Sequence, residues 1–143
     1  MRHPEPPSHD VYRHQFTVPE SAEDQTGHVN NVVYVQWMQD VAVLHFEEAV
    51  GNHVLEQAGA TWVARSHYIE YLKPVFAGDE VIALTWVESL RRVRSLRRYQ
   101  FLRHSDNLLL AWGETDWVFV DVGSGHPKYV PREITRLFKP DGM

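Results

Sequence analysis

The longest apolar-rich stretch of the chain is residues 32–50, and its periodicity is that of a helix with an unusually wide apolar face. The apolar residues at helical spacing are Tyr34, Trp37, Val41 and Leu44, flanked by Val35, Met38 and Ala42. Because several of the residues in this stretch are β-branched, the helix must be held by packing against a large apolar surface rather than by intrinsic propensity. Asn30 or Asn31 supplies an N-cap, and Gly51 supplies a C-terminal stop.

The surface that this helix needs is predicted by the remainder of the chain. Strands are expected at residues 11–18, 61–72, 79–91, 94–103 and 108–121, with a short helical turn at 54–58 and another at 131–138. In the last strand Ala111, Gly113 and Thr115 share one face, so that another element, the helix, can approach closely. The order of one strand, a long helix and four strands predicts an α+β domain with one helix against an antiparallel sheet.

Composition limits the classes of protein that fit. The 143 residues predict one domain, residues 11–143, after an N-terminal arm at residues 1–10 that its three prolines mark as flexible. No apolar run approaches the roughly 20 residues of a membrane helix, and no signal peptide is evident, so a cytoplasmic location is expected. The chain has no cysteine and its nine histidines lack ligand-like spacing, so no metal is expected. The net charge of −5 argues against nucleic acid.

Three stretches of sequence carry a family pattern. They are DQTGHVNNVVY at residues 24–34, IEYLKP at 69–74 with GDEV at 78–81, and AWGETDWVFVD at 111–121 with PREI at 131–134. They resemble the hotdog-fold acyl-CoA thioesterases of the 4-hydroxybenzoyl-CoA thioesterase type, whose pattern Asp-x-x-Gly-His-Val-Asn-Asn precedes a nearby Tyr. The first stretch, placed just before the wide-faced helix, is the most specific, and together the three extend over about residues 11–138.

The resemblance implies a hotdog fold, in which a curved antiparallel sheet of about five strands wraps a long central helix. It also implies a homodimer in which two sheets join edge to edge, or a homotetramer. The active sites would then lie at the dimer interface and use both subunits.

By this resemblance Asp24 is the catalytic carboxylate. A carboxylate serves thioester hydrolysis either as a general base for water or as a direct nucleophile, and the sequence leaves both open. The start of a helix presents unpaired N–H groups and a partial positive charge, so the backbone N–H at about Asn31 is the expected oxyanion site. Asn30 and Asn31 would cap the helix at the same point.

The remaining candidates surround these two residues. His28 matches a histidine with a catalytic role in plant acyl-carrier thioesterases, although those relatives have Asn where this chain has Thr26. Glu70 lies where some relatives carry a second acidic residue. Gly27 is expected to turn with positive φ or to let a ligand approach. Asn30 and Tyr34 complete the predicted substrate contacts, with a place in the core as the alternative for Tyr34.

Five arginines stand within eight residues: Arg91, Arg92, Arg94, Arg97 and Arg98. They form either a solvated hairpin end or a phosphate site, because arginine forks suit the phosphates of coenzyme A. Arg91, Arg92 and Arg94 are the predicted substrate-binding members. An acidic acyl carrier protein would use the same patch.

The sequence therefore predicts an enzyme that hydrolyses an acyl-CoA thioester to a free carboxylic acid and coenzyme A. No cofactor is expected beyond the coenzyme A part of the substrate, and the acyl group is not readable. Two alternatives remain on the same fold: a non-catalytic acyl-thioester binding protein and a hotdog hydratase or dehydratase. No Gly-x-Ser-x-Gly motif is present, which disfavours a serine hydrolase.

Overall fold

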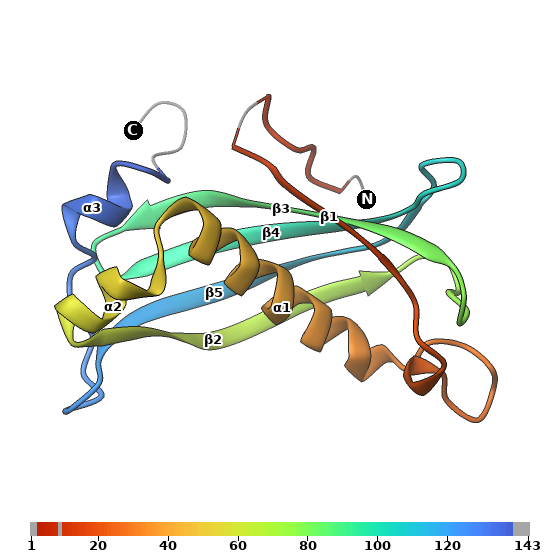
Figure 1. Cartoon of the computed structure of the whole chain (residues 1–143), viewed down its shortest axis with the longest axis horizontal. Coiled ribbons are helices and arrows are strands. Elements are labelled where there is room, and N and C mark those ends of the chain that lie inside the picture. The colour runs from red at the N-terminus through yellow and green to blue at the C-terminus, as the bar shows by residue number, and fades with distance from the viewer. Residues whose placement is uncertain (1–2, 9, 139–143) are drawn as a thin grey trace.

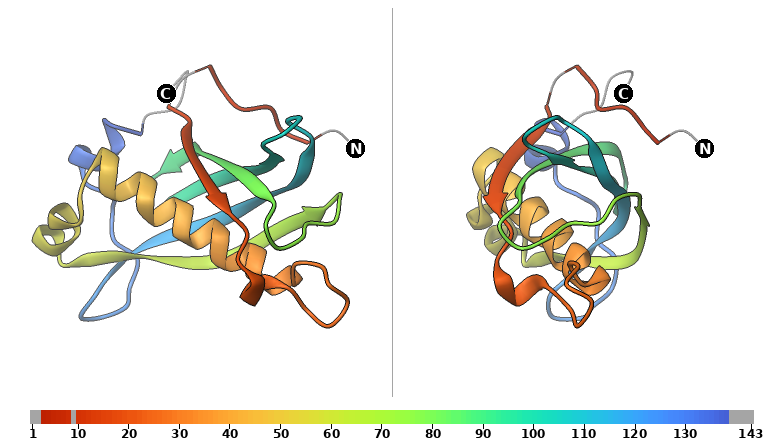
Figure 2. Two further views of the ribbon diagram at one scale, coloured as in Figure 1. Left: turned by 45° about the vertical axis from the view of Figure 1, so that its right-hand side comes forward. Right: turned by 90° about the vertical axis from the view of Figure 1, so that its right-hand side faces the viewer.

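A five-stranded antiparallel sheet curves around one long helix, α1 (Asn31–Ala49), in the computed structural model, which describes residues 3–8 and 10–138. The strands lie in the order β1-β3-β4-β5-β2. They are β1 (Tyr12–Thr17), β2 (Ala60–Tyr71), β3 (Glu80–Arg91), β4 (Arg94–Arg103) and β5 (Leu109–Asp121), and the short helices are η1 (Glu20–Ala22), α2 (Asn52–Ala58) and α3 (Arg132–Thr135). Figure 2 shows α1 lying within the curve of the sheet. The expected α+β architecture, one helix wrapped by about five strands, is confirmed.

The predicted elements all form, and their ends shift by at most two residues except at the last turn, which was predicted to end at residue 138 and ends at Thr135. Asn30 is the N-cap of α1, and its side chain accepts from the backbone N–H of Val32. Gly51, just beyond the helix, has φ of 101°, and Gly59 ends α2 in the left-handed region, as expected of C-terminal glycines. The single-turn 3-10 helix η1 was not predicted, because three residues are too few to show a periodicity.

The buried face of α1 matches the predicted one only in part: Val35 and Trp37 are half-buried, Leu44 is exposed, and His45 and Phe46 are buried without having been predicted. Its buried residues are Tyr34, Met38, Val41, Ala42, His45 and Phe46. Leu44 was expected on this face but is 37% exposed, so that expectation is wrong. At 100° per residue, Tyr34, Val41 and His45 define the centre of the face, and Leu44 is rotated about a quarter-turn from that line.

Register shifts in three strand pairs accompany the curvature of the sheet. They lie between Ala64 and Ser66, between Val87 and Ser89, and between Phe101 and Leu102. An extra residue on one strand bends that strand and increases its twist. Gly113 of β5 faces α1, but the helix atom nearest to it is Cε of Met38, and the backbone atom that lies close to it is the carbonyl oxygen of Tyr68 in β2, so the expected close approach of the helix backbone is not observed.

The strand β2 forms one edge of the sheet, because it pairs only with β5. Large hydrophobic side chains are exposed along and just after it: Val63, Tyr68, Tyr71 and Leu72. An edge strand of twelve residues with exposed apolar side chains is a template for pairing with another chain. At the opposite edge, β1 pairs only with β3.

The N-terminal arm forms no regular secondary structure in its described residues, 3–8 and 10. It contacts the sheet at Gln100, whose Nε2 donates to the carbonyl oxygen of Pro4 at 3.0 Å. The side chain of Gln100 lies on the face of the sheet opposite α1, because its neighbours Tyr99 and Phe101 pack in the core cluster beneath the helix.

Replacing Gly113 tests the close approach of the β2 backbone and the Met38 side chain to β5. A Cβ atom there would lie 2.6 Å from the carbonyl oxygen of Tyr68 and 3.2 Å from Cε of Met38. We expect Gly113→Ala to lower the free energy of unfolding by about 1–3 kcal/mol in urea denaturation, the range for overpacked cores. Gly123→Ala is the matched control, because its Cβ would meet only one side-chain oxygen at 3.4 Å. Equal stability of the two variants would contradict the close approach.

Candidate active site

The loop before α1 is closed on itself by backbone hydrogen bonds. The Asp24 N–H donates to the carbonyl oxygen of His28 at 2.8 Å, and the Gly27 N–H donates to that of Asp24 at 3.1 Å. At the two ends of the loop, the Asn30 N–H donates to the carbonyl oxygen of Ala22 at 2.9 Å. Gly27 has φ of 86°, which confirms the expected positive φ and explains a glycine in this turn. The loop therefore has a defined shape rather than being a free connection.

The connection between β2 and β3 holds this loop from a second side. The Val29 N–H donates to the carbonyl oxygen of Val75 at 2.8 Å, and the Ala77 N–H donates to Oε2 of Glu23 at 2.8 Å. Ala22 and Val29, at the two ends of the loop, are buried in the core cluster. The second sequence stretch, residues 69–81, thus supports the first, residues 24–34.

Asp24 lies exposed in this loop with one carboxylate oxygen occupied. Its Oδ1 accepts from the backbone N–H of Thr26 at 2.8 Å and from the Thr26 hydroxyl at 2.6 Å. These bonds, that of the hydroxyl first, hold the pKa of Asp24 below the usual aspartate range. Asp24 is therefore ionised at neutral pH. Within the described residues Oδ2 accepts no hydrogen bond, so it is available to a water molecule or a substrate carbon.

The start of α1 leaves one backbone donor unused. The N–H of Val32 donates to Oδ1 of Asn30 at 2.9 Å, and the N–H of Val33 donates to the Asn30 carbonyl oxygen at 2.9 Å. The N–H of Asn31 has no acceptor in the described part of the chain. Tyr71 fixes the same turn from β2, because its hydroxyl donates to the Asn31 carbonyl oxygen at 3.0 Å. A free N–H at a helix N-terminus is a suitable donor to a developing oxyanion.

His28 is in the same loop as Asp24 and is exposed. Its ring meets the ring of Phe76 edge-on, with centroids 5.2 Å apart. Its charge contributes to the lowered pKa of Asp24, but less than the Thr26 hydrogen bonds do. The structure therefore brings together Asp24, Gly27, His28, Asn30 and Asn31.

Glu70 lies on the other face of the sheet. It accepts from the Tyr68 hydroxyl at 2.6 Å and from Nε1 of Trp112 at 3.1 Å, and these two bonds lower its pKa, that of Tyr68 first. The next residue, Tyr71, points toward α1 and packs on Tyr34. Because side chains alternate along a strand, Glu70 points away from the helix start in its own chain.

Tyr34 is a core residue. It is 3% exposed, and its ring contacts Trp37, Tyr71 and Phe101. Burial raises the pKa of its hydroxyl. That hydroxyl has no hydrogen-bond partner among the described residues. Of the two alternatives for Tyr34, a substrate contact or a core residue, the structure places it in the core.

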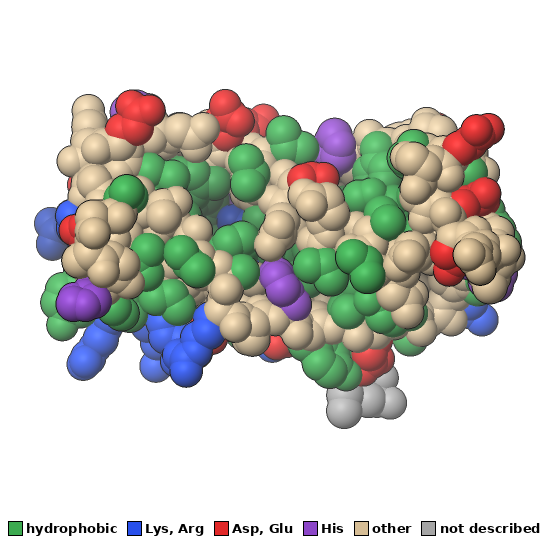
Figure 3. Space-filling view, turned by 90° about the horizontal axis from the view of Figure 1, so that it is seen from below, with side chains coloured by type: hydrophobic (Ala, Val, Ile, Leu, Met, Phe, Trp, Pro, Cys, Tyr) green, Lys and Arg blue, Asp and Glu red, His purple; other side chains and the backbone are tan. Residues whose placement is uncertain are grey.

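The predicted phosphate-binding arginines lie at the far end of the molecule. Arg91 and Arg92 are exposed at the β3–β4 hairpin, and Arg94 forms an ion pair with Asp116. This hairpin is at the α2 and α3 end of the sheet, whereas the loop before α1 is at the opposite end (Figure 1). Lys and Arg side chains gather at one end of the molecule in Figure 3. Within one chain, the structure does not bring these arginines to Asp24.

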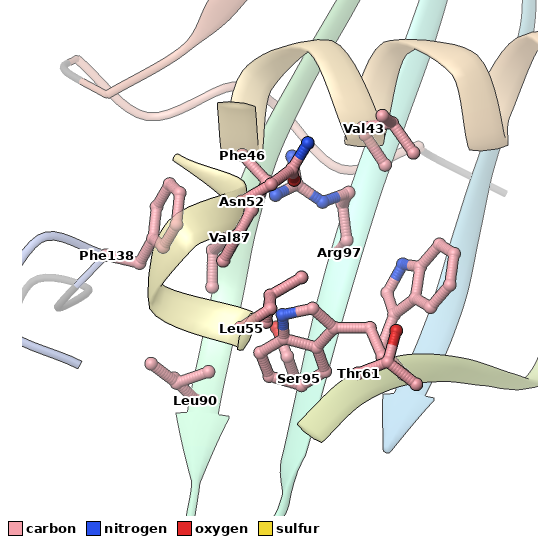
Figure 4. A pocket seen from close by; sticks show the side chains of 13 residues that line it. Val43, Phe46, Asn52, Leu55, Thr61, Val87, Leu90, Ser95, Arg97 and Phe138 are labelled. Atoms are coloured by element: carbon pink, nitrogen blue, oxygen red, sulfur yellow. The ribbon is translucent and has the colours of Figure 1, made fainter. Parts of the chain in front are cut away.

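Sequence analysis missed a pocket beneath the second half of α1. It has a volume of about 140 Å³ and lies between α1, α2 and the inner face of the sheet (Figure 4). Its lining residues include Val43, Phe46, Leu55, Thr61, Trp62, Arg97, Trp117 and Phe138. Arg97 is the one charged member. The alternation of β4 was the available signal, because Arg97 shares its face with the apolar residues Tyr99 and Phe101.

Two further features bear on the class of protein. In the described ranges, 3–8 and 10–138, no cluster of three or more His, Asp or Glu residues is arranged to hold a metal ion. No helix of that same part is both long enough and apolar enough to cross a membrane.

Comparison with solved structures identifies the class of fold. The chain resembles Slr0204, a 1,4-dihydroxy-2-naphthoyl-CoA thioesterase from Synechocystis, with a TM-score of 0.81 and 15% identity. The match covers 93% of this chain and 99% of Slr0204. It also resembles a DHNA-CoA thioesterase from Staphylococcus aureus, with a TM-score of 0.75 and 22% identity. That match covers 90% of this chain and 83% of the other. The protein SAV2348 from the same organism, solved in complex with CoA, matches with a TM-score of 0.80 and 16% identity. That match covers 90% of this chain and 84% of the other. The fold is therefore that of the hotdog thioesterases.

The sequence itself gives the family. Residues 18–138 match the model of the thioesterase-like superfamily, and the chain belongs to that superfamily. This confirms the predicted class of enzyme, a thioester hydrolase. A comparison with curated protein sequences finds no match.

The lowered pKa of Asp24 can be measured directly. We expect its side-chain carboxyl carbon, followed by NMR, to titrate below the range of exposed aspartates, because two hydrogen bonds from Thr26 stabilise the charged form. Thr26→Val removes the hydroxyl donor and should raise that pKa, whereas Thr26→Ser keeps the donor and should leave it low. An unchanged pKa in Thr26→Val would show that the hydroxyl bond is not the cause.

Proposed function

We propose that the protein is an acyl-CoA thioesterase in which Asp24 and the first backbone N–H of α1 carry out the hydrolysis. The observation that supports this most is the placement of both groups in one hydrogen-bonded loop. The carboxylate has a free Oδ2, and the Asn31 N–H has no acceptor in the described part of the chain. Ionised carboxylate and oxyanion donor are the two groups that hydrolysis of a thioester requires.

The reaction follows from these two groups. Asp24 takes a proton from water while the water oxygen attacks the thioester carbon, or Oδ2 attacks that carbon directly and water then opens the resulting anhydride. In both routes the carbonyl oxygen becomes negative and accepts from the Asn31 N–H. Collapse of the tetrahedral intermediate breaks the carbon–sulfur bond. The thiolate takes up a proton, and the products are a carboxylic acid, as its carboxylate, and free coenzyme A.

The complete site requires two subunits in this proposal. Antiparallel pairing of β2 with its copy about a two-fold axis would cover the exposed hydrophobic side chains of this edge. It would place the Tyr71 end of one strand beside the Ala60 end of the other. The helix start of each subunit would then lie near the α2 end of its partner, which is also the end that carries Arg91, Arg92 and Arg94. Those arginines would thereby serve phosphates of a substrate held at the partner's loop.

Coenzyme A is the thiol carrier that we favour. One structural relative, SAV2348, was solved with CoA, and two others are named as thioesterases of an aromatic acyl-CoA. Another relative is an acyl-ACP thioesterase, so a carrier protein is the alternative thiol.

Thiol release from a panel of aromatic, short-chain and long-chain acyl-CoAs tests the proposal. We expect turnover on at least one class and a loss of about 10³-fold or more in kcat for Asp24→Asn, because that variant removes the base or nucleophile while keeping the side-chain shape. Glu20→Gln is the control, an exposed acidic residue just before the same loop. Thermal unfolding of each variant separates loss of chemistry from loss of fold.

Each other outcome points elsewhere. Turnover that survives in Asp24→Asn would move the chemistry to His28 or to Glu70 of the second subunit. A 3-hydroxyacyl product from an unsaturated thioester would identify a hydratase. Tight binding with no turnover on CoA or carrier-protein thioesters would identify a binding protein.

Assembly through β2 has its own test. We expect a dimer in sedimentation velocity at micromolar concentration, because the exposed apolar edge of β2 is covered on pairing. Val63→Lys, at an exposed position of that edge, should shift the protein toward monomer and reduce activity in parallel. Val122→Lys, at an exposed hydrophobic residue outside β2, is the control. A Val63→Lys monomer with full activity would exclude a site shared between subunits.

A further inference from the structure

A buried arginine, Arg97, lies in the wall of the pocket beneath α1, and no ion pair joins it to a carboxylate in the described part of the chain. Arg97 is 5% exposed, and its Nη1 donates to Nδ1 of His45 at 2.9 Å and to the Thr85 hydroxyl at 3.1 Å. No Asp or Glu of the described residues forms an ion pair with it, although its neighbours Arg94 and Arg98 both have such pairs. An unpaired buried charge is strongly destabilising. The chain thus keeps an ion where an apolar side chain would pack more favourably.

Both protein partners of Arg97 are neutral. Burial, and secondarily the charge of Arg97, lower the pKa of His45 to about 4, so its ring is uncharged at neutral pH and Nδ1 accepts the hydrogen bond. Burial also lowers the pKa of the Arg97 guanidinium, but this group is basic enough to remain protonated in proteins. Because no other charged residue lines the pocket, the lining carries one positive charge.

Arg97 is one of the residues that line the pocket. Nε and Nη2 have no partner among the described residues, and the Phe138 ring lies 5.9 Å from Cζ. Figure 4 shows Arg97 extending from β4 toward Phe46 and Asn52, above the apolar side chains of Leu55 and Val87. Donors at the end of an apolar cavity suit a ligand with an apolar body and an anionic tip.

The volume of the pocket limits that ligand. A cavity of about 150 Å³ holds one benzene molecule, so about 140 Å³ accommodates about six non-hydrogen atoms. This matches a short acyl chain.

We propose that the pocket binds the far end of the acyl group, and that the preferred substrates are thioesters of short acyl chains ending in a carboxylate, which pairs with Arg97. This inference rests on the thioesterase function proposed above. A guanidinium fork matches the two oxygens of a carboxylate, and the apolar walls take the methylene groups between carboxylate and thioester.

Access to the pocket fits the two-subunit site. The exposed lining residues Val43, Asn52 and Thr61 mark a mouth between α1, α2 and the start of β2. The helix start of the same chain is fifteen residues from Phe46, about 22 Å at 1.5 Å per residue, which a short acyl group cannot bridge. Pairing of β2 strands would bring Asp24 of the partner subunit, whose helix start is tied to the Tyr71 end of its strand, to the Thr61 end of this one.

Matched substrates test the inference. We expect kcat/KM for glutaryl-CoA and adipoyl-CoA to exceed that for pentanoyl-CoA and hexanoyl-CoA by at least tenfold. Arg97→Met, an apolar replacement of similar length, should reverse this preference. Arg136→Met, which removes an exposed arginine from the end of α3, should leave it unchanged. An equal or opposite preference in the native protein would overturn the inference.

A binding measurement keeps this test separate from catalysis. Trp62 and Trp117 line the pocket, so their fluorescence reports its occupancy. We expect pentanoate to change the fluorescence saturably and pentanamide to bind at least tenfold more weakly. If Arg97→Met does not fold, Arg97→Lys, which keeps the charge but loses the fork, should weaken pentanoate binding about tenfold.

The two measurements distinguish the two proposals. Saturable pentanoate binding without hydrolysis of any thioester would contradict the proposed function and leave the pocket assignment standing. Hydrolysis without a carboxylate preference and without pentanoate binding would contradict the pocket assignment and leave the proposed function standing.

Discussion

The functional part of this molecule depends on the hydrogen bonds that fix the loop before α1. A helix N-terminus offers unpaired donors in any protein, but such donors serve chemistry only where the preceding chain is held still. Here Ala22 and Val29 are buried anchors, and the polar residues between them project outward. The bond from Val29 to Val75 and the bond from Ala77 to Glu23 come from a segment about fifty residues later in the chain. The Asp24 carboxylate is therefore positioned by the core, although it is itself exposed.

Most of the fold was readable from the sequence because its signals are local. The period of α1, its cap at Asn30 and the glycines after its end are each set by neighbouring residues, and the structure confirms them. The loop of Asp24 was found through a family pattern, since nothing in its composition distinguishes it from an ordinary acidic loop. Gly27 is the exception, because a residue with positive φ is a physical requirement of the turn.

The features that sequence analysis did not predict depend on which face of a strand a residue occupies. Glu70 and Tyr71 are adjacent, but one points away from α1 and the other toward it. The register shift between Ala64 and Ser66 changes that parity within β2, and no sequence signal marks it. Alternation along β4 likewise puts the side chain of Arg97 on one face of the sheet and those of Arg94 and Arg98 on the other. A cluster of five arginines suggests a solvated surface, and only the pairing of β4 with its neighbours shows that one of them enters the core.

In the two proposals, reaction chemistry and ligand selection lie at opposite ends of α1. The loop of Asp24 requires few fixed residues: a carboxylate, a glycine and a helix cap. The pocket under the other end of α1 is lined by side chains from α1, α2, β2, β3, β4 and β5 together with Phe138, so single substitutions there can change its size or charge without touching the loop. A protein built this way can keep one hydrolytic mechanism while its acyl group changes. In the proposed dimer, paired β2 strands would bring the loop of one subunit to the pocket of the other, so the edge strand would contribute to catalysis as well as to assembly.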